Sequence, residues 1–316
     1  MTEQKDTKEA KEQTPAFGAN GHIQPGRYYG HGLPYAPIDH YPGKIIAVEG
    51  TDGVGRSTQI RLLREWLEVQ GYGVVETGWT RSALMQPTIE LAKSSNTLNK
   101  LTFVLLYATD FADRLEKEII PALKAGFVVL SDRYIFSALA RAGVRGVDRA
   151  WLRSLYGFAI APHLVFYLKI DVDTLIRRVL SARGMDFWES GMDLKGGDDI
   201  YDSFRSYQNK LLREYSSMAD EFGFRVLDAR RPVDVLQDEL RRQVQAFLVD
   251  ADGPQAQEPE PGPGQLEDLA CFRPADEVLE RALDRAGVRP LAAQPGGFLQ
   301  QIRTKHKICA FHVHLM

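Results

Sequence analysis

The chain has 316 residues, of which 44% are hydrophobic and 26% are charged, and its formal net charge is −3. These values are ordinary for a globular protein, and the near-neutral charge provides no positive field to attract nucleic acid or an anionic membrane. Two cysteines argue against a disulfide framework, and we find no apolar run of membrane-spanning length and no secretory signal. We therefore expect a cytoplasmic protein without nucleic-acid or membrane partners.

Composition divides the chain into four parts. Residues 1–41 are polar and then rich in Gly, Pro, His and Tyr, which predicts a tail or an arm on the domain surface. Residues 42–249 have the pattern of a folded domain. Residues 250–266 form a Pro/Gly/acidic linker, and residues 267–316 a C-terminal tail with one amphipathic helix expected at 275–286.

The C-terminal tail ends in a group of metal-ligand residue types, His306, Cys309, His312 and His314. Their spacing is compatible with a metal site. The tail offers no second ligand group at a distance and little chain to fold around an ion. A solvated tail is therefore the preferred interpretation.

Within residues 42–249, short apolar runs alternate with amphipathic segments. The apolar runs predict strands at residues 45–48, 73–76, 127–130, 164–168 and 224–227. Apolar residues at helical spacing predict helices at 59–70, 101–123, 150–159, 200–222 and 233–247, with another beginning at 173. This alternation predicts an α/β fold, with a five-stranded parallel sheet between two helical layers. Ligands of such sheets bind beyond the carboxyl ends of the strands.

The first strand leads into a glycine-rich loop and then a helix, which is the context of a phosphate-binding loop. The residues expected to bind nucleotide are Gly50, Thr51, Asp52, Gly53, Val54, Gly55, Arg56, Ser57 and Thr58. Glycines let backbone N–H groups surround an anion, and the helix start adds its positive dipole end. The hydroxyl of Ser57 is placed to contact a magnesium ion on the nucleotide.

Arg56 occupies the position at which the GxxxxGK[ST] signature has lysine. Arginine keeps the positive charge and can bind phosphate through two parallel N–H bonds, but it is bulkier and planar. One interpretation is a working loop with an arginine clamp. The other is a loop that binds nucleotide weakly or no longer supports turnover.

Asp132 and Arg133 follow the third predicted strand. An Asp-Arg pair is often a solvated surface ion pair that contributes little. Here the pair lies at a strand carboxyl end, as the phosphate-binding loop does, so both should face one crevice.

Several motifs in this order resemble those of the thymidylate kinase family, over residues 44–248. They are Glu-Gly-x-Asp-Gly-x-Gly-x-Ser-Thr-Gln at 49–59, Leu-Leu-Tyr-Ala-x-Asp at 105–110, Ser-Asp-Arg-Tyr-x-x-Ser at 131–137 and Leu-x-Ile-Asp-Val at 168–172. The resemblance implies the P-loop nucleoside-monophosphate kinase fold with a mobile lid, ATP and Mg²⁺ as cofactors, nucleotide substrates and a homodimer.

The resemblance also implies roles for residues that handle phosphate. Arg133 would bind the acceptor phosphate, and Asp132 would hold the magnesium shell together with Ser57. Arg56, Arg133 and Arg183 would offset charge on the transferring group, with Arg183 the cation of a lid at residues 183–197. Phosphoryl transfer depends on such positioning and positive charge.

On the acceptor side, the resemblance places Asp52 near the sugar and Tyr107 against the base. The departures from the family also concentrate here. Phe111 stands where an arginine is expected, Ala138 and Arg141 replace residues that read the base, and residues 78–82 replace an Arg-Glu-Pro-Gly-Gly hinge. We expect Phe111 and Arg141 to contact the substrate in a rebuilt base site.

Three functions remain open on this basis. The first is an ATP-dependent kinase that converts dTMP to dTDP. The second is a kinase of the same fold for another phosphate acceptor. The third is a nucleotide-binding module that has lost turnover.

Overall fold

The computed structural model describes residues 24–36, 41–94, 99–182, 184–194 and 199–251. The chain divides into two units, Met1–Ala251 and Asp252–Met316, and all described residues belong to the first. The expected helix at 275–286, the histidines and cysteine of the C-terminal tail, and the lid residue Arg183 lie outside the described residues.

Five parallel strands form one sheet, as the alternating pattern predicts. Their order in the sheet is β2-β3-β1-β4-β5. The strands are β1 (Lys44–Glu49), β2 (Val74–Gly78), β3 (Val128–Asp132), β4 (Leu164–Lys169) and β5 (Arg225–Asp228). Val48 of β1 pairs with Asp132 of β3, so the carboxyl ends of these two strands lie at the same level.

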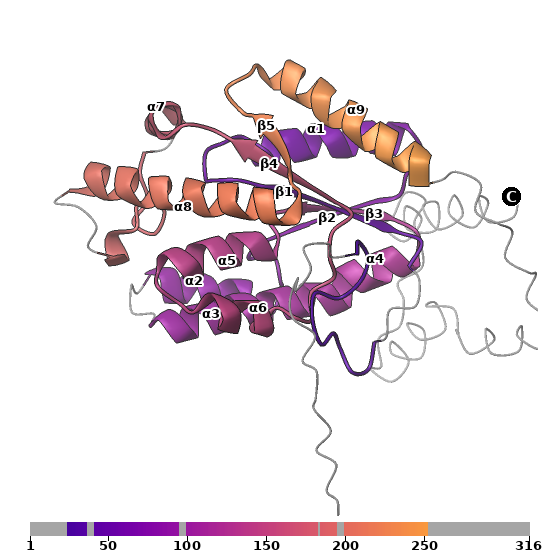
Figure 1. Cartoon of the computed structure of the whole chain (residues 1–316), viewed down its shortest axis with the longest axis horizontal. Helices are drawn as coiled ribbons and strands as arrows, with labels where there is room; N and C mark the ends of the chain where they lie inside the picture. Colours follow the sequence, from indigo (N-terminus) through magenta and orange to yellow (C-terminus); the bar gives the residue numbers. More distant parts are fainter. Residues whose placement is uncertain (1–23, 37–40, 95–98, 183, 195–198, 252–316) are drawn as a thin grey trace, which may run out of the picture. The chain divides into compact units, whose positions relative to one another are not determined.

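Helices cover both faces of the sheet (Figure 1). They are α1 (Arg56–Val69), α2 (Gln86–Ser94), α3 (Lys100–Arg114), α4 (Ile120–Lys124), α5 (Ile135–Val144), α6 (Arg149–Leu155), α7 (Val172–Ala182), α8 (Ile200–Phe222) and α9 (Val233–Ala251). Helices α1 and α9 lie on one face, and α3, α5 and α8 lie on the other.

Side chains of β1 alternate between the two cores. Ile45 and Ala47 belong to the cluster that faces α3, α5 and α8, whereas Ile46 and Val48 belong to the cluster with α1, α7 and α9. All four are fully buried. Burial on both faces explains why the strands are continuous apolar runs in the sequence.

Several helix boundaries differ from those predicted. The expected helix at 101–123 is interrupted by a π-helical segment, Leu115–Ile119, between α3 and α4. The helix expected at 150–159 ends at Leu155, because the chain after it pairs with the N-terminal arm. The predictions did not include α2 or α5. Helix α5 has only 10 residues and is mostly buried, so its sequence is apolar overall and offers few polar positions that mark a helix.

Residues 24–36 form an arm on the domain. Tyr28 makes an antiparallel bridge to Ile160, and the Tyr29 N–H donates to the Ala159 carbonyl oxygen at 2.9 Å. The Tyr29 ring is buried edge-on against Phe136 and Phe222. The arm thereby adds to the core around α5. None of the helices in the described ranges is long and apolar enough to cross a membrane.

Candidate active site

The segment between β1 and α1 has the backbone of an anion-binding loop. Gly50, Gly53 and Gly55 have φ values of +146°, +79° and +104°, which residues with a Cβ rarely adopt. Gly55 is the N-cap of α1, and no side chain of the described residues caps this end of the helix. The first-turn N–H groups and the positive end of the helix dipole can therefore stabilise a phosphate at the loop.

Arg56 begins α1, and its side chain turns back onto the loop. Its Nη1 donates to the carbonyl oxygens of Gly50, at 2.7 Å, and Thr51, and its Nε donates to Oδ1 of Asp132 at 2.8 Å. The residue is 8% exposed. Burial by itself lowers the pKa of its guanidinium, but the charges of Asp132 and Asp52 outweigh burial and raise that pKa. Arg56 thus stays charged and links the loop to β3.

Ser57 and Asp132 bring two oxygen ligands together. The Ser57 hydroxyl donates to Oδ2 of Asp132 at 2.9 Å. Burial pushes the pKa of Asp132 up, but Arg56 and Arg133 outweigh it and the pKa is lowered. A hydroxyl and an ionised carboxylate fit magnesium, which prefers oxygen. Among the described residues, no group of three acidic, His or Cys side chains could hold a metal, so phosphate and water oxygens would complete the shell.

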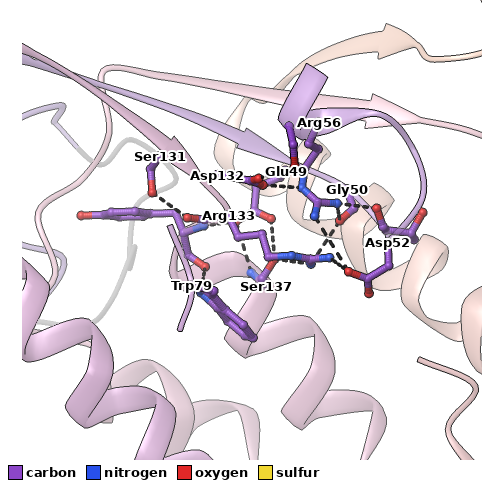
Figure 2. A network of polar contacts seen from close by, with 12 residues as sticks. Glu49, Gly50, Asp52, Arg56, Trp79, Ser131, Asp132, Arg133 and Ser137 are labelled. Carbon is purple, nitrogen blue, oxygen red and sulfur yellow. Dashed lines mark hydrogen bonds and ion pairs between the residues drawn. The ribbon is translucent and has the colours of Figure 1, made fainter. Parts of the chain in front are cut away.

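Arg133 follows the last residue of β3 and has a left-handed backbone, with φ of +71°. Its N–H donates to the Val48 carbonyl oxygen at 3.0 Å, and its carbonyl oxygen accepts from the Ser131 hydroxyl at 2.6 Å. These bonds hold the sparsely populated conformation at the ends of β1 and β3. The guanidinium is thereby directed at the loop, where Nη1 donates to the Gly50 carbonyl oxygen at 3.3 Å (Figure 2).

The buried carboxylate of Glu49 supports the turn after Arg133. It accepts the N–H of Tyr134 at 2.7 Å and the hydroxyl of Ser137 at 2.7 Å, and the same hydroxyl accepts from Nη1 of Arg133 at 3.1 Å. Burial raises the pKa of Glu49, although the bonds from Ser137 and Tyr134 oppose the shift. Glu49 therefore positions Arg133 through Ser137.

Asp52 gathers the arginines of the site. Its carboxylate forms ion pairs with Arg133 and Arg141, and Nη2 of Arg56 lies 3.9 Å from it. Burial pushes the pKa of Asp52 up, but the charges of Arg133 and Arg141 outweigh burial and hold the pKa far below its usual range. These cations come from α1, from the residue that follows β3 and from α5, and they meet at one carboxylate.

A pocket opens beside this cluster, at the carboxyl ends of β1, β2 and β3. Its lining combines aromatic and charged side chains: Asp52, Arg56, Trp79, Thr80, Arg81, Lys93, Phe103, Tyr107, Asp132, Arg133, Arg141, Arg145, Asp186, Trp188 and Glu189. The expectation that the loop and the Asp132-Arg133 pair share a crevice is confirmed.

Tyr107 and Phe111, the two aromatic residues expected to contact the base, have different surroundings in the structure. Tyr107 lines the pocket but is only 6% exposed, because the rings of Trp79 and Phe103 cover it. Their centroids lie 4.7 and 4.6 Å from the centroid of the Tyr107 ring. Phe111, one turn along α3, packs in the core at 5.1 Å from the Tyr134 ring and is not part of the pocket lining. Direct contact of Phe111 with a substrate does not fit this position.

The loop at residues 78–82 is held from α3. The Asp110 carboxylate accepts the N–H groups of Thr80, at 3.2 Å, and Ser82, at 3.1 Å, and it pairs with Arg114 at 3.0 Å. Thr80 has a left-handed φ of +56°, and these hydrogen bonds hold its backbone in that conformation. The loop therefore presents Trp79 to the pocket from a fixed position.

Sequence reasoning missed other lining residues, including Lys93, Arg145 and Trp188. Arg145 lies four residues after Arg141, so a helix through this region would have put both on one face. Lys93 and Trp188 had no such signal, because they come from segments distant in the sequence. The lid residue Arg183 lies outside the described residues, whereas residues 186–194 are described.

A glycine loop between a strand and a helix, a Ser-Asp pair at its end and arginines around the crevice define a P-loop phosphotransferase that acts on nucleotides.

Comparison with known proteins narrows this class to one family. The family model described as thymidylate kinase matches residues 48–240. A probable thymidylate kinase 2 of Saccharolobus solfataricus is 39% identical over 202 residues, which cover 63% of this chain and 94% of that protein. A probable thymidylate kinase of Thermococcus kodakarensis is 32% identical over 218 residues, covering 65% and 98%. A thymidylate kinase of Desulfotalea psychrophila is 35% identical over 148 residues, covering 46% and 73%. The chain belongs to the thymidylate kinase family.

Proposed function

We propose that this protein transfers the γ-phosphoryl group of ATP to dTMP, forming ADP and dTDP. The observation that carries the proposal is the convergence of the glycine loop, the Ser57–Asp132 pair and the arginines on one pocket. A module that merely binds nucleotide has no need for arginines that reach beyond the loop toward an acceptor. Family membership supports the same reaction.

In the proposed reaction, an oxygen of the acceptor phosphate attacks the γ-phosphorus of ATP, and the bond to the bridging oxygen breaks as ADP leaves. The loop N–H groups and the α1 dipole hold the donor phosphates. Arg133 and Arg141 release the Asp52 carboxylate and bind the acceptor phosphate in its place. Arg56 keeps the loop in shape and adds charge beside it. Asp52 is then free to accept from a hydroxyl of the acceptor sugar.

Magnesium fits the residues present. Ser57 and Asp132 would hold it, together with oxygens of the nucleotide. When bound, it neutralises part of the phosphate charge.

We also propose a homodimer formed through α3. Leu101 and Leu105 lie one turn apart on this helix and are 57% and 42% exposed. Exposed leucines in an i, i+4 stripe are the pattern of a helix face that packs against a partner.

From the reaction, in which ATP and a nucleoside monophosphate are substrates, we infer a cytoplasmic location.

One observation favours a kinase that acts on another acceptor. Phe111 occupies the position at which the family has an arginine, and it is buried away from the pocket, so no side chain from this position reaches the base. The test is ADP release from ATP and Mg²⁺ across dTMP, dUMP, dCMP and purine monophosphates. Selective turnover of dTMP is expected. Selective turnover of a different monophosphate would assign that acceptor instead.

Arg56→Lys separates a kinase from an inactive module in the same assay. Lysine keeps the charge but cannot reach both loop carbonyl oxygens and Asp132 together. We expect kcat/KM to fall about tenfold, equivalent to about 1.4 kcal/mol, with turnover still measurable. ATP binding without turnover in either protein would leave the binding module as the function.

A further inference from the structure

The N-terminal arm is bonded along its length to residues 157–161, the connection between α6 and β4. Backbone hydrogen bonds join the two stretches: the N–H groups of Gly26, Tyr29 and Gly30 donate to the carbonyl oxygens of Ala161, Ala159 and Gly157 at 2.9, 2.9 and 2.8 Å. In the opposite direction, the Ala161 N–H donates to the Arg27 carbonyl oxygen at 2.7 Å. The arm therefore follows this connection closely, with the bridge from Tyr28 to Ile160 between these bonds.

Two glycines allow the arm to approach the connection this closely. A Cβ at Gly30 would lie 2.9 Å from the Cα of Gly157, and a Cβ at Gly157 would lie 2.8 Å from Nδ1 of His31. Because a backbone atom cannot move aside as the end of a side chain can, position 30 needs glycine for the arm to bind here. The family model begins at residue 48, so the arm lies outside the part of the chain that defines the family.

Residues 157–161 also bind Tyr134, which directly follows Arg133. The Tyr134 hydroxyl donates to the Ile160 carbonyl oxygen at 2.6 Å, and the side chain is fully buried. Burial raises the pKa of Tyr134, so the hydroxyl keeps its proton and can donate. The N–H of Tyr134 donates to Glu49 at 2.7 Å, and its carbonyl oxygen accepts from the Trp79 indole at 3.1 Å. Every polar group of Tyr134 is thus bonded, and the hydroxyl is its link to the segment that the arm binds.

The arm contacts the same turn a second time, through Tyr29. The Tyr29 ring lies edge-on to the Phe136 ring, with centroids 6.1 Å apart. Phe136 precedes Ser137, whose hydroxyl accepts from Nη1 of Arg133 at 3.1 Å (Figure 2). Tyr134 and Phe136 therefore both connect the turn at residues 133–137 to the arm, one through Ile160 and the other directly.

We propose that Tyr134 is a positioning residue for Arg133 and that the N-terminal arm, by binding residues 157–161, holds Tyr134 in place. This inference rests on the proposed kinase function, in which Arg133 binds the acceptor phosphate. The left-handed backbone of Arg133 is sparsely populated and persists only where the surrounding structure holds it. The ends of β1 and β3 bind its own N–H and carbonyl oxygen, and the arm adds support to the residue that follows.

Amide hydrogen exchange, followed by mass spectrometry on the full chain without nucleotide, tests the link directly. Gly30→Ala displaces the arm and changes no residue of the active site. We expect the N–H groups of residues 133–137 to exchange about tenfold faster, which corresponds to the loss of about one hydrogen bond. Tyr134→Phe keeps the ring, removes the bond to Ile160 and should give the same increase. Combining the two changes should add little, because both act through one contact.

The kinase assay tests the consequence for the acceptor. In both variants the KM for the monophosphate should rise about fivefold, in line with a partly lost contact to Arg133. The KM for ATP should stay unchanged, because the loop N–H groups bind the donor phosphates. Assays are run at a temperature at which circular dichroism shows every variant folded.

Two controls separate positioning from stability. Val244→Ala removes buried methyl groups from the other core, on α9, and should lower the melting temperature without changing either KM or the exchange of residues 133–137. Tyr35→Ala, at an exposed position of the same arm, should match the wild type in all three measurements.

Unchanged exchange of residues 133–137 in Gly30→Ala and Tyr134→Phe would overturn the inference, since the arm would then only add stability. Faster exchange with an unchanged monophosphate KM, or an equal rise of both KM values, would also overturn it. If the wild type turns over no monophosphate, the proposed function fails. The exchange measurement then still decides by itself whether the arm holds the turn.

Discussion

At the scale of single residues, the site depends on buried charges that compensate one another. Arg56 binds two carbonyl oxygens of its own loop as well as Asp132, so the arginine serves as a brace in the position where lysine is usual. Asp132 in turn binds Ser57. Removing one member leaves a buried charge without its partner, which costs more than the pair itself contributes.

Asp132→Asn should therefore lower the free energy of unfolding at pH 7 by about 3 kcal/mol. Because the folded pKa of Asp132 lies below its ordinary value of 3.8, the stabilisation is present above about pH 4 and is lost as pH falls through the folded pKa. Urea unfolding from pH 3 to 7 should show the two proteins converging in acid.

Asp173→Asn is the control, because its ion pair with Arg205 is exposed and should contribute less than about 1 kcal/mol. A difference between wild type and Asp132→Asn that stays constant down to pH 3, or that is absent at pH 7, would contradict the assignment.

At the scale of secondary-structure elements, the N-terminal arm joins the core that supports α5. The bridge from Tyr28 to Ile160 continues to Tyr134, whose hydroxyl donates to the Ile160 carbonyl oxygen at 2.6 Å. Tyr134 directly follows Arg133 in the chain. The arm is therefore linked, through Ile160 and Tyr134, to the turn that directs Arg133 at the glycine loop.

Tyr29→Ala should destabilise the domain by about 3 kcal/mol, because it removes an aromatic ring packed against Phe136 and Phe222. Thermal unfolding measures the loss. Tyr35→Ala is the matched control on the same arm, since Tyr35 is exposed, and it should change stability by less than about 0.5 kcal/mol. Equal effects of the two substitutions would mean that the arm does not share the core.

At the scale of the whole molecule, the proposed dimer rests on the exposed leucines of α3. Leu101→Glu combined with Leu105→Glu should convert a dimer, of twice the 35.5 kDa chain mass, to a monomer in sedimentation velocity. Val69→Glu, on the exposed side of α1, is the control and should leave the mass unchanged. A wild-type protein that sediments as a monomer at micromolar concentration would reject the dimer.

The strands, the glycine loop and the bounds of α8 can be predicted from local sequence pattern. All five strands lie within one or two residues of the predicted ranges, because buried parallel strands are short apolar runs that local sequence marks clearly. The glycine loop is recognisable because a phosphate loop requires its residues at fixed spacing, and the Asp132-Arg133 pair is singled out because it follows a predicted strand. Helix α8 has its predicted bounds because Asp199 caps its first turn, Gly223 ends it in a left-handed conformation, and the residues between them bury a mostly apolar face.

Tertiary structure alone decided which distant side chains meet. It paired Asp52 with Arg141 and Arg145 with Asp193, and it carried Trp188 across to Phe103. It also removed Phe111 from the pocket, although one turn of α3 separates it from Tyr107. Local periodicity records which face of an element is apolar, but the partner of that face depends on strand order and on where each connecting segment packs. For that reason the glycine loop and the Asp132-Arg133 pair can be found in the sequence, whereas the aromatic side of the pocket depends on the fold.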